Sequence, residues 1–405
     1  MKLLKKLPLR SYFNYETRKR TSKLVLAAEL PDPQIFSLVD YEGKPSESDV
    51  VLDNSDITEL KKILQKMEEM LVIDDILLKA QRQGRISFYM TAFGETAAIL
   101  GSVAALKKED MVFSQYRELA GLYYRGFTIK EITDNCVGNY LDCNKGRQMP
   151  IHFTSKKNGY FSVSSPIGTQ IPQAAGYGYG LRVSGKDEIA TAFIGDGAAS
   201  QGDFYTGLNF SQTLKSQMLF ILRNNGYAIS TPIGEQTSGK SILDKALSFG
   251  INGLMVDGND AVAMYKASQF LRNQIVAEKQ PAFLEAITYR LSDHSTSDYS
   301  VLYRKEGELD NWKGKNDPVT RLRNFLTLSG DIDAKWEEEL NQTKKTVKKE
   351  VIKCLAESFQ EKLPSVDSMF EDVYYELPET LKAQKKELKE HLQLYNEHYD
   401  LDKHQ

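Results

Sequence analysis

The chain has 405 residues, more than one typical domain but a length at which α/β enzymes build one core with appendages. Hydrophobic residues at 41% and charged residues at 26% are ordinary for a globular protein, and no apolar run approaches the roughly 20 residues of a membrane span. The formal net charge is −3, and positive and negative residues are mixed along the chain. This distribution creates no electrostatic field that would attract nucleic acid or anionic lipid. We therefore expect neither a nucleic-acid partner nor membrane insertion. Three cysteines without a CxxC pair argue against a disulfide framework or a zinc site.

The first 30 residues form a strongly basic segment. Before Glu29 the single acidic residue is Glu16, whereas the basic residues are Lys2, Lys5, Lys6, Arg10, Arg18, Lys19, Arg20 and Lys23. This composition resembles a mitochondrial presequence, and a basic disordered arm is the alternative. A presequence would direct the chain to the mitochondrial matrix, and we otherwise expect it in the cytoplasm.

Downstream of Pro33 the sequence alternates between strand-like and helix-like segments. We expect a short strand and a turn at Gly43 within 35–45, then a helix over 57–81 with Ser55 as its cap. Apolar runs at 111–113, 189–194, 218–222, around 255 and at 282–287 alternate with helical patterns. This alternation predicts an α/β fold in which helices cover both faces of a parallel sheet.

Beyond Asp317 the chain becomes charged, with helical patterns at 336–361 and 378–398. The simplest interpretation of such segments is that they form solvated helices with one apolar stripe. We therefore divide the chain into a basic arm or presequence at 1–30, an α/β domain at 31–375 and a helical tail at 376–405.

The most informative segment is the one that follows the apolar run at 189–194. There Asp196 lies between Gly195 and Gly197, and two glycines let the backbone turn sharply and approach a ligand. A helix from about 203 to 214 leads into the run at 218–222, which ends at Asn224 and Asn225. In such a βαβ unit these polar residues lie at the carboxyl ends of strands, where open parallel sheets bind ligands. Carboxylate, amide and backbone oxygens suit Mg²⁺ that also binds phosphate oxygens.

Taken alone, the Gly-Asp-Gly motif at 195–197 is more simply interpreted as a turn, and the Asn-Asn pair at 224–225 as the end of a strand, because Gly, Asp and Asn dominate turns. Positions 198 to 223 place 26 residues between Gly197 and Asn224, which matches the GDG…NN motif of thiamine diphosphate enzymes. From about residue 31 onward the chain resembles the α subunits of branched-chain 2-oxo acid dehydrogenases. The resemblance rests on RQGRISFYM (82–90), QYRELAG (115–121), KGRQMPIHF (145–153), SSPIGTQIPQAAG (164–176), RNNGYAISTP (223–232), YRLSDHSTSDYS (289–300) and DVYYELPETL (372–381).

The resemblance implies a thiamine diphosphate site with Mg²⁺. Asp196, Asn225 and the carbonyl of Tyr227 would bind the metal. Two arginines would hold the diphosphate, because guanidinium groups fork onto paired oxygens, and surface ion pairs are the alternative for them. The implied cofactor contacts are Tyr116, Arg117, Ser165, Ile167, Gly195, Asp196, Gly197, Ala198, Arg223, Asn225, Tyr227 and His294.

Three further assignments follow from the resemblance. His294 is the implied catalytic histidine, at the diphosphate end of the cofactor. Ser295 corresponds to an inactivating phosphorylation position, in a polar loop that we expect to be exposed and mobile, while the family's second position falls on Lys305. A potassium site would use Ser164, Pro166, Thr169 and Gln170, although such a turn more often bonds to itself.

The implied reaction is the oxidative decarboxylation of 3-methyl-2-oxobutanoate and related branched 2-oxo acids, with transfer of the acyl group to a lipoyl group. The cofactor supplies the difficult chemistry. The implied partners are a β subunit, in a heterotetramer of two α and two β chains, and a lipoylated acyltransferase component. The β chain would contribute the glutamate that activates the cofactor. A regulatory kinase and phosphatase would act on Ser295.

Some residues depart from the family pattern or suggest other functions. Asp293 stands where a second histidine is common, and Glu95 receives no role because its segment lacks a family Glu-Gly pair. Residues 234–241 satisfy the P-loop pattern of NTPases, but Pro232 interrupts the strand that a P-loop needs. A pyruvate or acetoin dehydrogenase α subunit is the nearer alternative, disfavoured by Gln115 and Gly226 and by the SSP string at 164–166.

Overall fold

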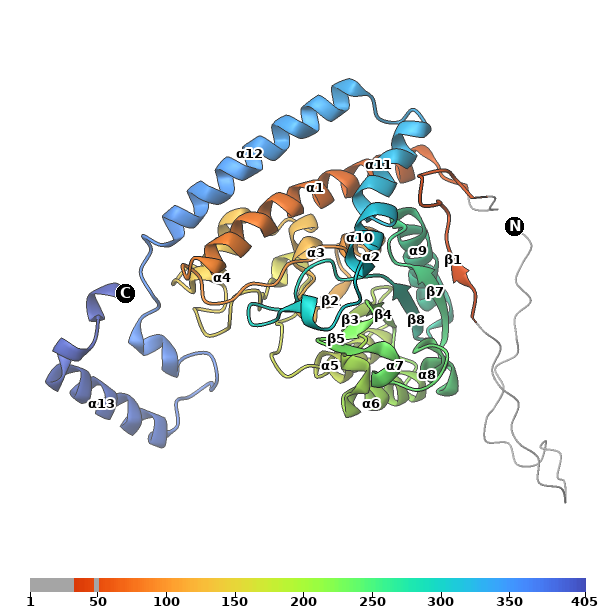
Figure 1. Cartoon of the computed structure of the whole chain (residues 1–405). Coiled ribbons are helices and arrows are strands. Elements are labelled where there is room, and N and C mark those ends of the chain that lie inside the picture. The colour runs from red at the N-terminus through yellow and green to blue at the C-terminus, as the bar shows by residue number, and fades with distance from the viewer. Residues whose placement is uncertain (1–32, 47–50) are drawn as a thin grey trace, which may run out of the picture.

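The computed structural model describes residues 33–46 and 51–405, so the basic segment at 1–30 lies outside the described residues. Its main feature is a six-stranded sheet in the order β1-β7-β8-β4-β3-β2, and all neighbouring strands are parallel (Figure 1). The strands are β1 (Ile35–Phe36), β2 (Met111–Phe113), β3 (Ala190–Gly195), β4 (Met218–Asn224), β7 (Asn252–Asp257) and β8 (Ala282–Ile287). This arrangement confirms the predicted α/β fold with a parallel sheet.

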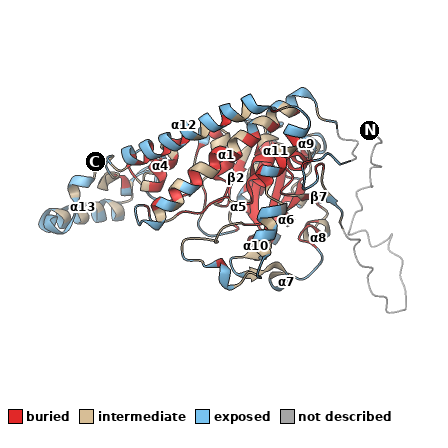
Figure 2. Cartoon of the chain, turned by 45° about the horizontal axis from the view of Figure 1, so that its top comes forward, coloured by how far each residue is buried: buried red, intermediate tan, exposed pale blue. Residues whose placement is uncertain are grey.

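Helices cover both faces of the sheet, and the side chains of the central strands alternate between two apolar clusters. On β4, Leu219 and Ile221 pack in one cluster, and Phe220 and Leu222 pack in the other. The first cluster contains α1 (Asn54–Arg82), α2 (Thr96–Ala104), α4 (Ile129–Val137), α9 (Ala261–Glu278), α11 (Pro318–Leu328) and α12 (Ala334–Ser358). The second contains α5 (Gln170–Val183), α6 (Gly202–Thr213) and α8 (Leu243–Ser248). Burial on both faces explains why these strands are continuous apolar runs (Figure 2).

The cap predicted for the first long helix is wrong by two residues. Asp53, not Ser55, is the N-cap of α1, and its carboxylate accepts hydrogen bonds from the backbone N–H groups of Ser55 and Asp56. The Asp56 side chain in turn accepts from the Asp53 N–H group, which completes a capping box. Ser55 uses its hydroxyl to donate to the Asp53 carboxylate instead.

The C-terminal region extends away from the sheet. Helix α12 runs alongside α1, and α13 (Glu379–Leu394) lies beyond the end of α12 (Figure 1). No residue of α13 is buried, as expected for a solvated helix. The chain end returns to Leu363, whose N–H group donates to the carbonyl of Lys403 (2.7 Å). Among residues 33–46 and 51–405, no helix has the length and apolarity to cross a membrane.

Shorter elements connect these layers near one edge of the sheet. They are α3 (Leu119–Tyr124), the hairpin β5 (Tyr227–Ala228) and β6 (Thr231–Pro232), α7 (Ile233–Gln236) and α10 (Glu308–Lys315). The hairpin, α7 and the segment before α10 follow the carboxyl ends of β4 and β8. They therefore surround the position at which the sequence predicts a cofactor site.

Candidate cofactor site

The two halves of the predicted motif meet at the carboxyl ends of β3 and β4. These strands are neighbours in the sheet, and Gly195 of β3 pairs with Arg223 of β4. Asp196 leaves β3 one residue later, and its N–H group donates to the Arg223 carbonyl (3.3 Å). Asn225 leaves β4 at the same edge. The sheet register therefore brings the carboxylate and the amide to one place, as the sequence predicts.

Asp196 is buried, and only one of its carboxylate oxygens has a hydrogen-bond partner. Oδ1 accepts from the Gly197 N–H group (2.9 Å), whereas Oδ2 is buried without one. Burial raises the pKa of Asp196 to about 6, and the nearby Glu95 carboxylate adds to this effect. An acceptor oxygen left unpaired in this way is costly, and a bound ion or water would satisfy it.

Asn225 is held from both ends of its amide. Its Nδ2 donates to Oε1 of Glu95 (3.0 Å), and its Oδ1 accepts from the N–H group of Tyr227 (3.1 Å). Gly226 lies between them with a φ of +86°, a left-handed conformation that glycine adopts without strain. The Tyr227 hydroxyl donates to the Glu308 carboxylate (3.0 Å), which ties the hairpin to α10.

Arg223 is fully buried between two carboxylates. It forms ion pairs with Glu95 and with Oε1 of Glu118 (2.5 Å). Burial acts to lower the pKa of Arg223, but Glu118 and Glu95 outweigh it and raise the pKa. Burial also acts to raise the pKa of Glu95, but Arg223 and Arg117 outweigh it and lower the pKa. Both side chains are therefore charged inside the protein.

Arg117, Tyr116 and His294 complete the cluster. The Arg117 guanidinium donates to the carbonyls of Thr91 (2.6 Å) and His294 (3.1 Å). The rings of Tyr116 and His294 meet edge to face, 6.1 Å apart. Burial, followed by the positive charges of Arg117 and Arg290, lowers the pKa of His294 to about 3. The imidazole is therefore neutral at pH 7.

The segment 164–170 lies at the start of α5, beside the end of β3. Thr169 donates to the Pro166 carbonyl (3.0 Å), and Gln170 donates to the carbonyl of Phe193 on β3 (3.1 Å). The hydroxyl of Ser165 is 3.0 Å from Nε2 of His152, and Ile167 is 39% exposed. Hydrogen bonds thus link this segment to itself, to His152 and to β3, and none of them joins Ser164, Ser165 or Ile167 directly to the Asp196 cluster.

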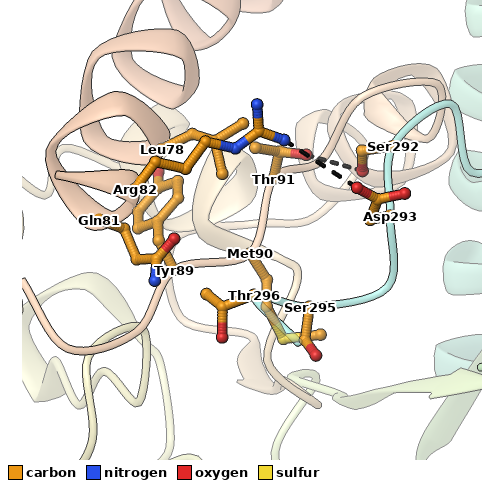
Figure 3. A pocket seen from close by; sticks show the side chains of 10 residues that line it. All are labelled: Leu78, Gln81, Arg82, Tyr89, Met90, Thr91, Ser292, Asp293, Ser295 and Thr296. Carbon is orange, nitrogen blue, oxygen red and sulfur yellow. Dashed lines mark hydrogen bonds and ion pairs between the residues drawn. The ribbon is translucent and has the colours of Figure 1, made fainter. Parts of the chain in front are cut away.

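The loop that contains Ser295 is less exposed than predicted. Ser295 is half-buried and lines a small pocket (Figure 3). Asp293 accepts from the N–H group (3.0 Å) and hydroxyl (2.6 Å) of Ser300, and Asp298 accepts from the His294 N–H group (2.6 Å). These internal bonds explain the difference, because polar residues that pair with one another need not face solvent. The pocket is lined by Leu78, Gln81, Arg82, Tyr89, Met90, Thr91, Ser292, Asp293, Ser295 and Thr296.

The P-loop pattern at 234–241 has the wrong structural context. Gly234 lies inside α7, a helix of four residues that follows the two-residue strand β6. A P-loop instead connects a buried strand directly to a long helix. The NTPase alternative is therefore not supported.

Three polar residues in the cluster received no role from the sequence. Glu95 contacts Arg223 and Asn225, Glu118 contacts Arg223, and Oε1 of Gln115 accepts from the Gly195 N–H group (2.7 Å). The available signal was Glu95 itself, a single carboxylate at the start of the otherwise uncharged segment 96–106. A charged residue in such a context is rarely buried without a partner.

This fold and site define a class of enzyme. The family described as "Dehydrogenase E1 component" matches residues 65–367, and the chain belongs to this family. The family implies thiamine diphosphate as the cofactor. Among curated proteins, the chain is similar to "2-oxoisovalerate dehydrogenase subunit alpha, mitochondrial" of Pan troglodytes, with 42% identity over 372 residues, covering 91% of this chain and 82% of the relative.

Relatives in other organisms have similar descriptions. The Caenorhabditis elegans protein is 40% identical over 394 residues, covering 96% of this chain and 90% of the relative. The "2-oxoisovalerate dehydrogenase subunit alpha 1, mitochondrial" of Arabidopsis thaliana is 41% identical over 361 residues, covering 88% of this chain and 74% of the relative. These similarities confirm the family resemblance found in the sequence.

Proposed function

We propose that this chain is the α subunit of a branched-chain 2-oxo acid dehydrogenase. The enzyme would oxidatively decarboxylate 3-methyl-2-oxobutanoate and related 2-oxo acids and pass the acyl group to a lipoylated acyltransferase component. The names of the relatives favour this substrate class over pyruvate or acetoin. The words "subunit alpha" in those names support a β partner, and the word "mitochondrial" supports a mitochondrial location. The assembly would be a heterotetramer of two α and two β chains in the mitochondrial matrix.

The observation that supports the proposal most is the unpaired oxygen of Asp196. This buried oxygen lies at the same strand edge as Asn225 and Tyr227, and together these residues offer a carboxylate, an amide oxygen and a backbone carbonyl. The set suits Mg²⁺ bound to a diphosphate, because Mg²⁺ prefers a few hard oxygen ligands and phosphate oxygens. Gly197 follows directly, and a Cβ atom there would lie 2.8 Å from the Cβ of Ala228, so the turn has no room for a side chain.

The other residues of the cluster would bind and orient the cofactor. Arg117 and Arg223 offer fixed positive charge to a diphosphate, and Tyr116 lies beside them. Nδ1 of His294 lies 3.4 Å from a guanidinium nitrogen of Arg290, which can only donate. The proton of neutral His294 is therefore on Nε2, which can donate a hydrogen bond to an anionic ligand. Thiamine diphosphate, when bound, would supply the nucleophile and accept the electrons released as CO₂ leaves.

Ser165 and Ile167 would contact the cofactor from the turn before α5, and Gly195 and Ala198 would do so through their backbones. In the same turn, Ser164, Pro166, Thr169 and Gln170 would hold K⁺. Phosphorylation of Ser295 by a kinase, reversed by a phosphatase, would regulate the enzyme. The support for this regulation is the position of Ser295 directly after His294, close to Asp293 and Asp298.

Two measurements test the proposed function. The chain assembled with a β subunit should turn over 3-methyl-2-oxobutanoate, and this activity should depend on thiamine diphosphate and Mg²⁺. In calorimetry, Asp196→Ala should abolish Mg²⁺-dependent binding of thiamine diphosphate, and Asn225→Ala should weaken it. Cofactor affinity in Asp196→Ala equal to that of the wild type would remove Asp196 from the site, and assembled protein that turns over only pyruvate would contradict the substrate class.

A further inference from the structure

Glu95 occupies the centre of the candidate site, although the sequence motif does not include it. The residue is fully buried at the position before α2, and its carboxylate makes no cap bond to that helix. It accepts instead from Arg223 and from Nδ2 of Asn225 (3.0 Å), and Nε of Arg117 lies 3.8 Å away. Three donor residues from two segments, Arg117 before α3 and both Arg223 and Asn225 at the end of β4, thus surround a carboxylate that can only accept hydrogen bonds.

This acceptor-only character determines how the Asn225 amide is oriented. A primary amide has one oxygen and one NH₂ group, and its neighbours decide which of them faces each side. Nδ2 faces Glu95, which accepts, and Oδ1 faces the N–H group of Tyr227, which donates (3.1 Å). Rotating the amide by half a turn would set oxygen against the Glu95 carboxylate and NH₂ against the Tyr227 N–H group. Both contacts would then be repulsive.

We propose that Glu95 is a positioning residue that orients the Asn225 amide so that its oxygen faces the divalent metal. The inference rests on the proposed function, because it assumes a metal bound between Asp196 and Asn225. Glu95 would not touch the metal or the substrate. It acts through Asn225, since an amide NH₂ group cannot ligate Mg²⁺ and only the oxygen is a hard ligand.

Glu95→Gln removes this control while preserving the size of the side chain. The glutamine oxygen would accept from the Arg223 guanidinium, which leaves its NH₂ group facing Asn225. Two NH₂ groups cannot pair, so the Asn225 amide would turn or move away, and its oxygen would leave the metal side. Changes in residues that orient metal ligands typically weaken metal affinity by about 10- to 100-fold.

Asn225→Asp provides the decisive second background, because both terminal atoms of aspartate are oxygens. Such a residue presents an oxygen to the metal in either orientation, so residue 95 no longer determines the ligand atom. We therefore expect Glu95→Gln to weaken metal binding strongly in the wild-type background and to have little effect, or the opposite effect, with Asp at 225. Because residues 95 and 225 are in contact, equal factors in the two backgrounds would show that residue 95 does not act through the side chain at 225.

The experiment measures the affinity for Mn²⁺, in the presence of thiamine diphosphate, by electron paramagnetic resonance. The α chain is assembled with its β partner, and the single and double variants are compared. Glu118→Gln is the matched control, because Glu118 is also buried and paired with Arg223 but does not contact Asn225. Its effect on Mn²⁺ affinity should be smaller than that of Glu95→Gln.

Wild-type Mn²⁺ affinity in Glu95→Gln, or the same factor in both backgrounds, would overturn the proposal. If Glu95→Gln alone fails to assemble with the β partner, the double variant of Glu95→Gln with Asn225→Asp decides. Mn²⁺ affinity comparable to that of Asn225→Asp supports the proposal, and loss of assembly or of Mn²⁺ binding contradicts it. A failure of the proposed function is recognised separately, because wild-type protein would then not bind Mn²⁺ together with thiamine diphosphate.

Discussion

A buried carboxylate in α1 allows a quantitative test of the structure. Asp74 is 1% exposed and accepts hydrogen bonds from the Tyr89 hydroxyl (2.7 Å) and the Ala92 N–H group (2.8 Å). Burial raises its pKa from 3.8 to about 7, although these two hydrogen bonds oppose the rise. Asp74→Asn preserves both contacts, because its oxygen can accept from Ala92 and its NH₂ group can donate to the Tyr89 oxygen.

The sign of the effect follows from the direction of the pKa shift. Since the folded protein binds this proton more tightly than the unfolded chain, the contribution to stability is complete below pH 3.8 and is lost as the pH rises through 7. A rise from 3.8 to about 7 corresponds to about 4 kcal/mol at 1.36 kcal/mol per pH unit. Between pH 5 and pH 9 the wild type should lose about 3 kcal/mol of stability that Asp74→Asn does not lose.

The assay is thermal unfolding of the assembled protein at pH 5 and pH 9. An unfolding entropy of about 2.1 cal/mol/K per residue over 405 residues converts about 3 kcal/mol into a Tm difference of at most about 4 °C, because the β subunit adds unfolding entropy of its own. The Tm of Asp74→Asn relative to the wild type should therefore rise from pH 5 to pH 9, by up to about 4 °C. Asp75→Asn is the control, because Asp75 is an exposed neighbour paired with Lys79. A Tm difference that does not change with pH, or that falls towards pH 9, would refute the reasoning.

Three further outcomes are expected. Gly197→Ala should reduce thiamine diphosphate affinity at least about tenfold in calorimetry, because its Cβ would lie 2.8 Å from that of Ala228. Gly202→Ala is the control and should bind the cofactor normally, because a Cβ there meets nothing within 4 Å. Ser295→Glu should lower the activity of the complete dehydrogenase complex at least about tenfold with a smaller loss of cofactor affinity, and full activity would exclude the loop as a switch. The chain without its β partner should not decarboxylate 3-methyl-2-oxobutanoate, and robust turnover by that chain would contradict the division of the active site.

The strands and the polar residues at their carboxyl ends could be predicted from sequence because they depend on local patterns. The runs at 111–113 and 282–287 coincide with β2 and β8, since strands buried on both faces must be apolar throughout. The order of the strands could not be predicted in this way. Strand β1 has two residues and pairs with β7, more than 200 positions later. The sequence of β1 does not indicate this pairing. The misplaced helix cap has a similar cause, because Asp53 and Ser55 are both good cap residues.

The partners of the candidate site were harder to predict than its ligands. Asp196 and Asn225 follow recognisable strands, but Glu95 lies 128 residues before Arg223 and 130 before Asn225. Its role depends on how α2 packs against α9 and α3, because this packing brings the start of α2 to the end of β4, and no local pattern encodes it. The domain limits at 30 and 375, the ligand roles and the phosphorylation of Ser295 stay predictions.

The segment 89–92 connects Arg117 in the candidate site with the loop that contains Ser295. The proposed regulation requires these two parts to act together. Asp74 holds this segment at Tyr89 and Ala92, and between them the carbonyl of Thr91 accepts from Arg117 (2.6 Å). The Thr91 hydroxyl also donates to Ser292 (2.8 Å), at the start of the loop that contains Ser295 (Figure 3). Ser295 lines the same pocket as Thr91, Ser292 and Asp293, so a negative charge there would be added to the loop that these contacts hold. Because Arg117 also donates to the His294 carbonyl, displacement of the loop would remove a support from the proposed diphosphate side of the site, while Asp196 and Asn225, the proposed metal ligands, would keep their positions at the strand ends.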